Sequence, residues 1–380
     1  MKKVVKKATA ETGSFWKGFK KPFFCLAPMA NVTDSVFRKM ITKYGKPDVM
    51  WTEFVSADGL NSVGRKKLLH NLVFSKKEKP IVAQLFTGHP DQILEAGKLV
   101  AKLGFDGLDL NMGCPDKAVE KQGGGASLMK NPKLAVEIID NARKGVELNF
   151  KSQISTFYAD YSAKATKSKE TSKVRNLKSK VAAFRAGVIP VSVKTRIGYK
   201  TVEWDWIKLM LNQKLPALTI HLRTRKEMSD VPAHWEIMPE IVRLRDEISP
   251  ETLIIGNGDV YSMEDGREKI AKYDCDGVMV GRGIFGKPWF FGNAKKLVID
   301  NSPEGIKTRL KILLEHTKLF EKTFLTKKLK NFDVMKKHFK AYVSGWKGAK
   351  ELRVELMNCK NSREVAGVVR EYLLTANEVV

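Results

Sequence analysis

The chain has 380 residues, 43% of them hydrophobic, and 68 Lys and Arg against 42 Asp and Glu give it a formal net charge of +26. This length can bury a large core and predicts about two domains, which excludes a small fold held together by disulfides. The positive charge indicates a polyanionic partner, nucleic acid first, although an anionic membrane surface or a generally lysine-rich source would produce the same excess.

The chain begins with a basic segment, MKKVVKKATAETGSFWKGFKK, which lacks the continuous apolar stretch of a signal peptide. No run of about 18 apolar residues follows anywhere to span a bilayer. The four cysteines (Cys25, Cys114, Cys275 and Cys359) form no C-x-x-C pair and have no nearby histidine cluster, which argues against a zinc site. We expect a reduced, cytoplasmic protein without a metal and without a membrane partner.

Eight short stretches rich in β-branched and apolar residues follow, each of a length typical of a strand. They are residues 23–29, 48–54, 80–86, 106–112, 189–195, 217–223, 252–258 and 276–282. Stretches of helical period separate them, for example residues 35–45, 90–104, 131–145 and 201–213. Alternating strands and helices predict a parallel sheet.

About eight such units fit a (β/α)₈ TIM barrel, which typically spans roughly 250 residues. The rival fold is an open doubly wound sheet, whose first strand is usually followed by a G-x-G-x-x-G turn. Here the first strand is followed by APMANVTDSVF, so the barrel is favoured.

Residues 147–184 interrupt the alternation as an insertion that is rich in Ser, Lys and Thr. It is made basic by Lys164, Lys167, Lys169, Lys173, Arg175, Lys178 and Lys180. Two interpretations stay open: a mobile arm that binds a polyanion, or a solvated and partly disordered loop.

After about residue 303 the strand pattern stops, and residues 307–324, 332–346 and 349–359 have helical periodicity with clustered Lys and Arg. We therefore expect a basic extension over 1–22, a TIM-barrel domain over 23–302 and an all-helical domain over 303–380.

Polar residues mark the carboxyl ends of the expected strands, where a parallel barrel gathers its functional groups. The strand ends read Pro28-Met29-Ala30, Glu53, Gln84, Asn111 with Cys114, Lys194 with Arg196, His221 with Arg223, Asn257-Gly258-Asp259 and Gly281-Arg282-Gly283, and every end after the first has a polar side chain. Buried polar groups cost free energy unless they find partners, so packing alone is a poor explanation for this set.

The last two strands end in glycine-containing turns, IIGNGD and MVGRG. Barrels often bind phosphate at this place through exposed backbone N–H groups. Ordinary tight turns would have the same sequence, but two such turns in adjacent units, with Arg282 able to pair with a phosphate, favour an anion site.

Three further residues have two interpretations each. Alternation directs Lys194 into the barrel mouth, where a lysine is rarely a passive core residue. His221 is either a satisfied core imidazole or, beside Arg223, a group that holds an anionic cofactor. Cys114 is either a small buried hydrophobe or a general acid, since a thiol with a pKa near 8.5 is mostly protonated at pH 7.

Seven segments together resemble the tRNA-dihydrouridine synthase family. They are APMANVTDSVFR, LNMGCP followed by GGGASLM, VSVKTRIGY, TIHLRTR, IIGNGDV, VGRGIFGKPWFF, and VMKKHFKAYVSGWKGAKELR, which resembles the family's helical RNA-binding module. The resemblance covers the barrel in order and continues into the C-terminal domain.

The resemblance implies an enzyme that binds flavin mononucleotide (FMN) and uses NADPH, with NADH as an alternative, to reduce the C5=C6 bond of selected uridines in tRNA. It assigns Pro28, Met29 and Ala30 to the flavin ring, Gln84 and Lys194 to its polar edge, and His221 to holding the cofactor. Asn257, Gly258, Asp259, Gly281 and Arg282 match the phosphate and ribityl end. Asn111, Arg196 and Arg223 are assigned to the substrate, and Cys114 to the proton donor. We expect a monomer.

The basic helical domain is where we expect most phosphate contacts to tRNA. The residues concerned are Lys327, Lys328, Lys330, Lys336, Lys337, Lys340, Lys347, Lys350 and Arg353. Three alternatives stay open: an FMN barrel acting on a small molecule, the same reaction on another RNA such as rRNA, and a non-catalytic RNA-binding protein.

Overall fold

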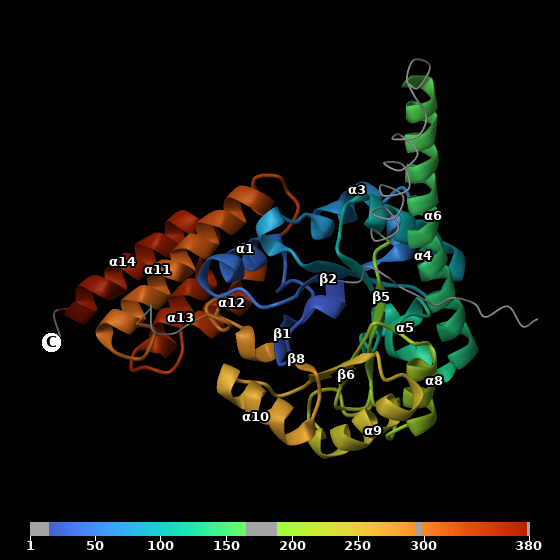
Figure 1. Ribbon diagram of the computed structural model, residues 1–380. Helices are drawn as coiled ribbons and strands as arrows, with labels where there is room; N and C mark the ends of the chain where they lie inside the picture. The colour runs from blue at the N-terminus through green and yellow to red at the C-terminus, as the bar shows by residue number, and fades with distance from the viewer. Residues whose placement is uncertain (1–14, 165–187, 293–297, 378–380) are drawn as a thin grey trace, which may run out of the picture.

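A computed structural model of the chain describes residues 15–164, 188–292 and 298–377. Eight parallel strands form one sheet in the order β1-β8-β7-β6-β5-β4-β3-β2 (Figure 1). They are β1 (Phe23–Leu26), β2 (Met50–Ser56), β3 (Ile81–Phe86), β4 (Gly107–Met112), β5 (Val191–Arg196), β6 (Ala217–His221), β7 (Leu253–Asn257) and β8 (Gly277–Val280). A parallel bridge between Cys25 and Val49 joins the two ends of the sheet, which closes the predicted barrel.

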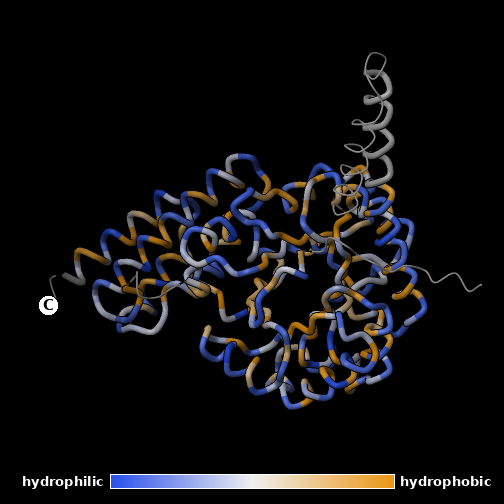
Figure 2. The backbone as a smooth tube through the Cα atoms, in the orientation of Figure 1, coloured by the Kyte–Doolittle hydropathy of each residue, from blue (hydrophilic) through white to orange (hydrophobic). Residues whose placement is uncertain are grey.

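Helices cover the outside of this barrel. The longer ones are α1 (Ser35–Tyr44), α4 (Pro90–Lys102), α6 (Pro132–Lys164), α8 (Trp204–Asn212), α9 (Met238–Ile248) and α10 (Met263–Tyr273). Shorter turns are η1 (Phe15–Gly18), α2 (Ala57–Leu60), α3 (Arg65–Leu68), η2 (Leu69–Leu72), η3 (Lys76–Glu78), α5 (Lys117–Lys121), η4 (Gly125–Lys130), η5 (Trp235–Ile237) and η6 (Arg282–Ile284). Figure 2 shows hydrophobic and hydrophilic residues on the same helices, as expected when only one face packs on the sheet.

Alternation along the strands decides which side chains enter the barrel. On β4, Leu108 and Leu110 belong to the core between sheet and helices, so Asp109 and Asn111 point inward. On β5, Val191 and Val193 face the helices in the same way, and Lys194 therefore points inward.

The amino end of the barrel is filled by apolar side chains. Trp16 of η1 is 3% exposed, and its ring centre lies 5.8 Å from that of Trp51 and 6.2 Å from that of Phe23. We predicted that residues 1–22 form an extension, but residues 15–18 belong to the barrel because Trp16 packs against its inner wall. Residues 1–14 lie outside the described part of the chain.

The expected insertion begins differently from the prediction. Residues 147–164 continue α6 without a break, so this part of 147–184 is helix and not loop, and Figure 1 shows it projecting beyond the barrel. Residues 165–184 lie outside the described ranges, so both interpretations of their basic residues stay open.

The C-terminal region is helical, as predicted. It contains α11 (Pro303–Phe320), the π-helical turn η8 (Glu321–Leu325), α12 (Val334–Tyr342), α13 (Ala349–Asn358) and α14 (Ser362–Asn377). Figure 1 shows these helices beside α1. The Tyr44 hydroxyl donates to Glu315 at 2.5 Å, and the ring of His316 stacks on Phe37 at 5.3 Å. The helical region is therefore fixed against the first helix of the barrel.

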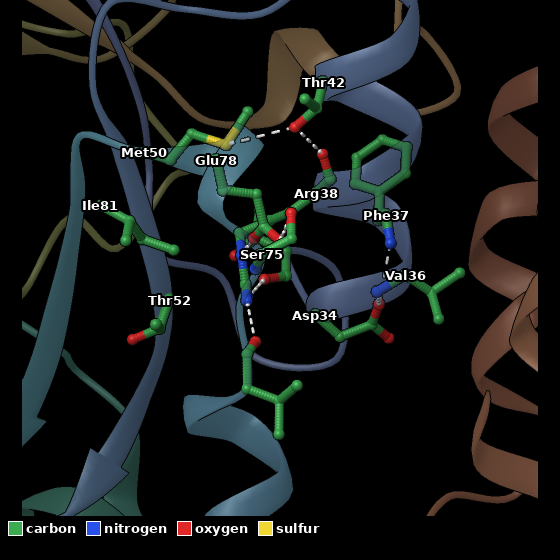
Figure 3. Close-up of polar contacts among 12 residues, drawn as sticks. Asp34, Val36, Phe37, Arg38, Thr42, Met50, Thr52, Ser75, Glu78 and Ile81 are labelled. Atoms are coloured by element: carbon green, nitrogen blue, oxygen red, sulfur yellow. Dashed lines mark hydrogen bonds and ion pairs between the residues drawn. The ribbon is translucent and has the colours of Figure 1, made fainter. Parts of the chain in front are cut away.

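Figure 3 shows how the start of α1 is held. Asp34 caps the helix by accepting hydrogen bonds from the backbone N–H groups of Val36 and Phe37. Arg38 is fully buried and donates from Nε to Glu78 at 2.7 Å and from Nη1 to the carbonyl of Thr33 at 2.8 Å. These contacts fix the loop between β1 and α1, which contains residues 28–30.

Candidate active site

A cavity of about 220 Å³ opens at the carboxyl ends of the strands. Its lining residues are Ala27, Pro28, Met29, Lys194, Arg196, His221, Arg223, Ser229, Asn257, Gly258, Asp259, Val260, Tyr261, Gly281, Arg282 and Gly283. The wall contains every predicted site residue except Ala30, Gln84, Asn111 and Cys114. Ala30 is exposed in the loop after β1.

Lys194 lies in the cavity wall, and its Nζ donates to Oδ1 of Asn257 at 2.9 Å. Burial, together with the positive charge of nearby Arg196, lowers the pKa of Lys194 to about 8. The ammonium group therefore still carries its charge at pH 7, but at a free-energy cost that an anion bound in the cavity would reduce.

Asp259 connects two arginines at the end of β7. It pairs with Nη2 of Arg223 and, through Oδ1, with Nη2 of Arg282 at 2.8 Å, and it accepts from the backbone N–H of Ala233 at 2.9 Å. Burial favours its neutral form, but the hydrogen bonds from Arg223 and from the backbone of Ala233, together with the charge of Arg223, outweigh burial and lower the pKa of Asp259 to about 2. Asp259 thus holds Arg282 at the cavity edge.

His221 is neutral at pH 7, because burial and the surrounding cations hold its pKa well below the ordinary value. Its Nε2 lies 3.3 Å from Nη1 of Arg223. A guanidinium has no acceptor, so Nε2 accepts and Nδ1 carries the proton. This tautomer leaves one N–H group for a ligand.

The two arginines predicted to contact substrate are largely engaged with the protein. Arg223 donates to Val231 and Asp259 in addition to His221. Arg196 donates from Nε to the carbonyl of Gly113 at 2.8 Å and from Nη1 to the carbonyls of Thr224 and Met228. Both line the cavity, but their contacts chiefly hold loops in place.

Cys114 follows β4 on a loop that is held from several sides. Its backbone N–H donates to Oδ1 of Asn111 at 2.9 Å, and its carbonyl accepts from the N–H of Ala126 at 2.9 Å. Gly125 has φ 62°, and a Cβ there would lie 2.6 Å from the Cys114 carbonyl oxygen, so the glycine run lets the chain approach this loop.

The Cys114 thiol is protonated at pH 7. Burial raises its pKa above the ordinary value of a thiol, despite the lowering influence of Arg196 and Lys194. Of the four cysteines, all in described parts of the chain, Cys25, Cys275 and Cys359 are buried and only Cys114 is partly exposed.

Gln84 and Asn111 lie on neighbouring inward positions beneath the cavity. Gln84 is fully buried and accepts at Oε1 a hydrogen bond of 3.0 Å from Nδ2 of Asn111. The two amides are therefore hydrogen-bonded to each other within the protein itself.

A Cβ at position 281 would have room among the neighbouring atoms. A Cβ added to Gly281 would only touch the Ala27 Cβ and the Met29 sulfur at 3.7 Å, an ordinary contact distance, and both atoms belong to cavity-wall residues. A Cβ on Gly283, by contrast, would lie 2.2 Å from the carbonyl oxygen of Val260. Gly281 therefore leaves space beside Ala27 and Met29, and the cationic wall suits an anionic ligand.

The sequence interpretation missed several residues of the site. Ser229, Val260 and Tyr261 line the cavity from loops whose course alternation does not predict. Asp109 lies two residues before Asn111 on the same strand face, so the strand period alone could have placed it inside the barrel.

Two further properties concern the described residues alone. No group of three or more His, Cys, Asp or Glu side chains among them is arranged to hold a metal ion. None of the helices in the described ranges is long and apolar enough to cross a membrane.

The chain is similar to known proteins in three comparisons. The family model "Dihydrouridine synthase (Dus)" matches residues 25–173 and 168–378. A "Probable tRNA-dihydrouridine synthase" of Staphylococcus aureus (strain MRSA252) is 38% identical over 370 residues, which cover 97% of this chain and 98% of the relative. A "Probable tRNA-dihydrouridine synthase 2" of Bacillus subtilis (strain 168) is 36% identical over 364 residues, covering 95% and 97%. Among solved structures, histamine dehydrogenase from Rhizobium sp. 4-9 aligns with TM-score 0.47 and 11% identity over 78% of this chain and 48% of that chain.

Proposed function

Because the chain belongs to the dihydrouridine synthase family, we propose that it reduces the C5=C6 bond of specific uridines in tRNA to 5,6-dihydrouridine. In this proposal FMN is the cofactor, NADPH is the reductant and Cys114 is the proton donor. The observation that carries the chemical part of this proposal is a protonated thiol on a rigid loop, close enough to the cavity cations Lys194 and Arg196 for their charges to act on it. A general acid has to keep its proton at working pH and stand at a fixed place.

The cavity wall fits a flavin phosphate. Arg282 is half-exposed and held by Asp259, so the rest of its guanidinium can pair with phosphate oxygens. Gly258 and Gly281 allow close approach of a ligand to the backbone. A carboxylate would repel the phosphate, so Asp259 does not contact it directly. Asp259 supports the phosphate end of the site by fixing Arg223 and Arg282.

The ring of the cofactor is assigned to Pro28, Met29 and Ala30, and its polar edge to Gln84 and Lys194. His221, with its free N–H, is assigned to holding the cofactor. Lys194 supplies positive charge where a reduced flavin is negative. Closing the Gly281 space with a methyl group would test this placement.

A flavin held by these residues would supply hydride chemistry, with NADPH as the source of the hydride for C6 of the uracil. Cys114 gives its thiol proton to C5, so that one hydride and one proton add across the double bond, and the thiolate regains a proton from water. Asn111 has one N–H left after bonding Gln84, and this group is assigned to the uracil.

The tRNA has to be held while one base leaves its stack, which costs a few kcal/mol. Exposed lysines of the helical region, such as Lys327, Lys328 and Lys337, are suited to phosphate contacts. Lys330 is a correction to the predicted set: its side chain is 6% exposed and paired with Glu53, so it cannot reach a phosphate. We expect the protein to act as a cytoplasmic monomer.

The test uses purified protein loaded with FMN, unmodified tRNA and NADPH or NADH, with dihydrouridine measured by mass spectrometry. Cys114→Ala should bind FMN and oxidise NADPH as the parent does, yet lose uridine reduction by at least about a hundredfold, the usual range for a missing general acid. Normal turnover in Cys114→Ala would remove this residue from the mechanism. A yellow protein indifferent to tRNA would instead favour a small-molecule substrate.

A further inference from the structure

Asp109 is a buried carboxyl group to which the proposed chemistry assigns no role. It lies on β4 with no exposed surface and points into the barrel beneath the cavity. Its Oδ1 accepts from the hydroxyl of Ser192 at 2.5 Å, and its Oδ2 accepts from Nε2 of Gln84 at 2.7 Å.

These contacts begin a chain of hydrogen bonds that ends at Cys114. Gln84 donates to Asp109 and accepts, at Oε1, from Nδ2 of Asn111 at 3.0 Å. Asn111 in turn accepts, at Oδ1, from the backbone N–H groups of Gly113 at 3.2 Å and Cys114 at 2.9 Å. Every step lies within the ordinary range for a hydrogen bond.

We call these hydrogen bonds from Asp109 through Gln84 and Asn111 to Cys114 the relay. Which group donates and which accepts at each step of the relay depends on Asp109. An amide side chain can rotate by half a turn and exchange its donor and acceptor ends, so Gln84 and Asn111 alone do not fix which end faces which. An ionised carboxylate only accepts, so it binds the donor end of Gln84, which leaves Oε1 for Asn111 and hence Oδ1 for the Cys114 loop. If either amide turned over, two donors or two acceptors would face each other in a buried place.

We propose that Asp109 is a positioning residue, which orients the amides of Gln84 and Asn111 and thereby holds the loop of Cys114 in its place. This proposal rests on the proposed function only in that Cys114 is taken as the proton donor. The hydrogen bonds themselves do not depend on that function. The same orientation leaves the second N–H of Asn111 unused by the relay and therefore available to a substrate.

Ser192 provides a matched control. It bonds the other oxygen of the same carboxylate and lies outside the relay, so Ser192→Ala removes one contact to Asp109 without changing which group faces Gln84. Asp109→Asn keeps the size of the side chain but can present an NH₂ group to Gln84. The orientation of the Gln84 amide is then no longer fixed.

The first readout is alkylation of the holoenzyme by iodoacetamide at pH 8, which lies above the pKa of about 6 to which burial raises Asp109. Because the other three cysteines are buried, the fast phase reports Cys114. Asp109→Asn should alkylate roughly five to ten times faster than the parent, as expected from losing about one hydrogen bond of loop restraint, while Ser192→Ala stays within about twofold. A parent-like rate in Asp109→Asn, or an equal rise in Ser192→Ala, would overturn the proposal.

The second readout separates positioning from general damage. In Asp109→Asn, uridine reduction should fall by roughly five- to tenfold, whereas reduction of bound FMN by NADPH should fall clearly less, because Gln84 is assigned only to the edge of the flavin ring. Equal losses in both half-reactions would contradict a role through Cys114. If the parent itself reduces no uridine, the proposed function fails, but the alkylation result still decides the positioning role.

Gln84→Leu is the second variant, in case Asp109→Asn does not fold. It removes the middle of the relay and should raise Cys114 alkylation to the same extent, and adding Asp109→Asn to it should change the rate no further. A parent-like rate in Gln84→Leu, or fully additive effects in the double variant, would refute the relay.

Discussion

Gly281 and Gly283 flank Arg282, yet a methyl group would meet different surroundings at the two positions. Gly281→Ala would fill only cavity space, so we expect an unchanged melting temperature and FMN affinity weakened by at least about tenfold, as for a steric block of a few kcal/mol. Gly283→Ala is the matched control and should unfold at lower temperature, because its Cβ would clash with the Val260 carbonyl. Fluorescence titration with FMN and thermal melts measure both effects. An undiminished FMN affinity in Gly281→Ala would contradict the assignment of this space.

Burying the charged Lys194 ammonium group lowers the stability of the cofactor-free protein by a measurable amount. The difference between its ordinary pKa of 10.5 and the value of about 8 corresponds to about 3 kcal/mol, which exceeds the roughly 1 kcal/mol of its hydrogen bond to Asn257. We therefore expect Lys194→Met to melt at a higher temperature than the parent at pH 7 while binding FMN more weakly.

The stability that Lys194→Met gains over the parent should decrease as pH rises. Between about pH 8 and 10.5 the unfolded chain binds more protons at Lys194 than the folded chain, so the stability of the parent rises with pH in this window. The advantage of Lys194→Met should be largest below pH 8 and shrink toward pH 10. Melting curves at pH 7, 8.5 and 10 check this, and an advantage that grew with pH would rule out the buried charge of Lys194 as its cause.

At the scale of elements, the Arg38–Glu78 pair joins α1 to η3, with neither side chain exposed (Figure 3). Arg38→Met should destabilise the fold by about 4 kcal/mol, because it leaves a buried carboxylate without its partner. The double variant Arg38→Met with Glu78→Met should be more stable than the single one, since no buried charge remains. Urea denaturation measures both, and a double variant less stable than the single one would show that packing, and not the unpaired charge, sets the cost.

All eight strands could be predicted from the sequence, because β-branched runs and turn residues are local signals. Alternation along β5 also directed Lys194 into the barrel, and the structure has it in the cavity wall. Lys330 shows the limit, since its neighbours Lys327 and Lys328 are exposed and only the fold decides that Lys330 turns inward to Glu53. The continuation of α6 through Lys164 was missed because a Ser- and Lys-rich composition masked its helical period.

At the scale of the whole molecule, Lys330 connects the helical region to the cavity. Its Nζ lies 2.9 Å from Glu53 and 3.5 Å from Asp34, and Glu53 also accepts from the backbone N–H of Asn31, next to the loop residues 28–30. The orientation of the helical region and the shape of one cavity wall therefore depend on the same ion pair.

Two lysines three positions apart should behave differently. Lys330→Met should lower stability by about 3 kcal/mol, because Glu53 and Asp34 stay buried, and it should weaken FMN binding through the loop. Lys327→Met should leave both unchanged and instead weaken tRNA binding and reduce its salt dependence by about one charge. Thermal melts and binding at several salt concentrations separate the two, and indistinguishable variants would contradict these roles.

Trp16, with Trp51 and Phe23, fills the amino end of the barrel, and in the described part of the chain the cavity opens at the carboxyl ends of the strands. Under the proposed function, NADPH and the extruded uridine would both reach the cofactor through this opening, and a ring occupying it would exclude the other. The two substrates then have to take turns, which gives ping-pong kinetics, with parallel lines in double-reciprocal plots and inhibition by excess tRNA that more NADPH relieves.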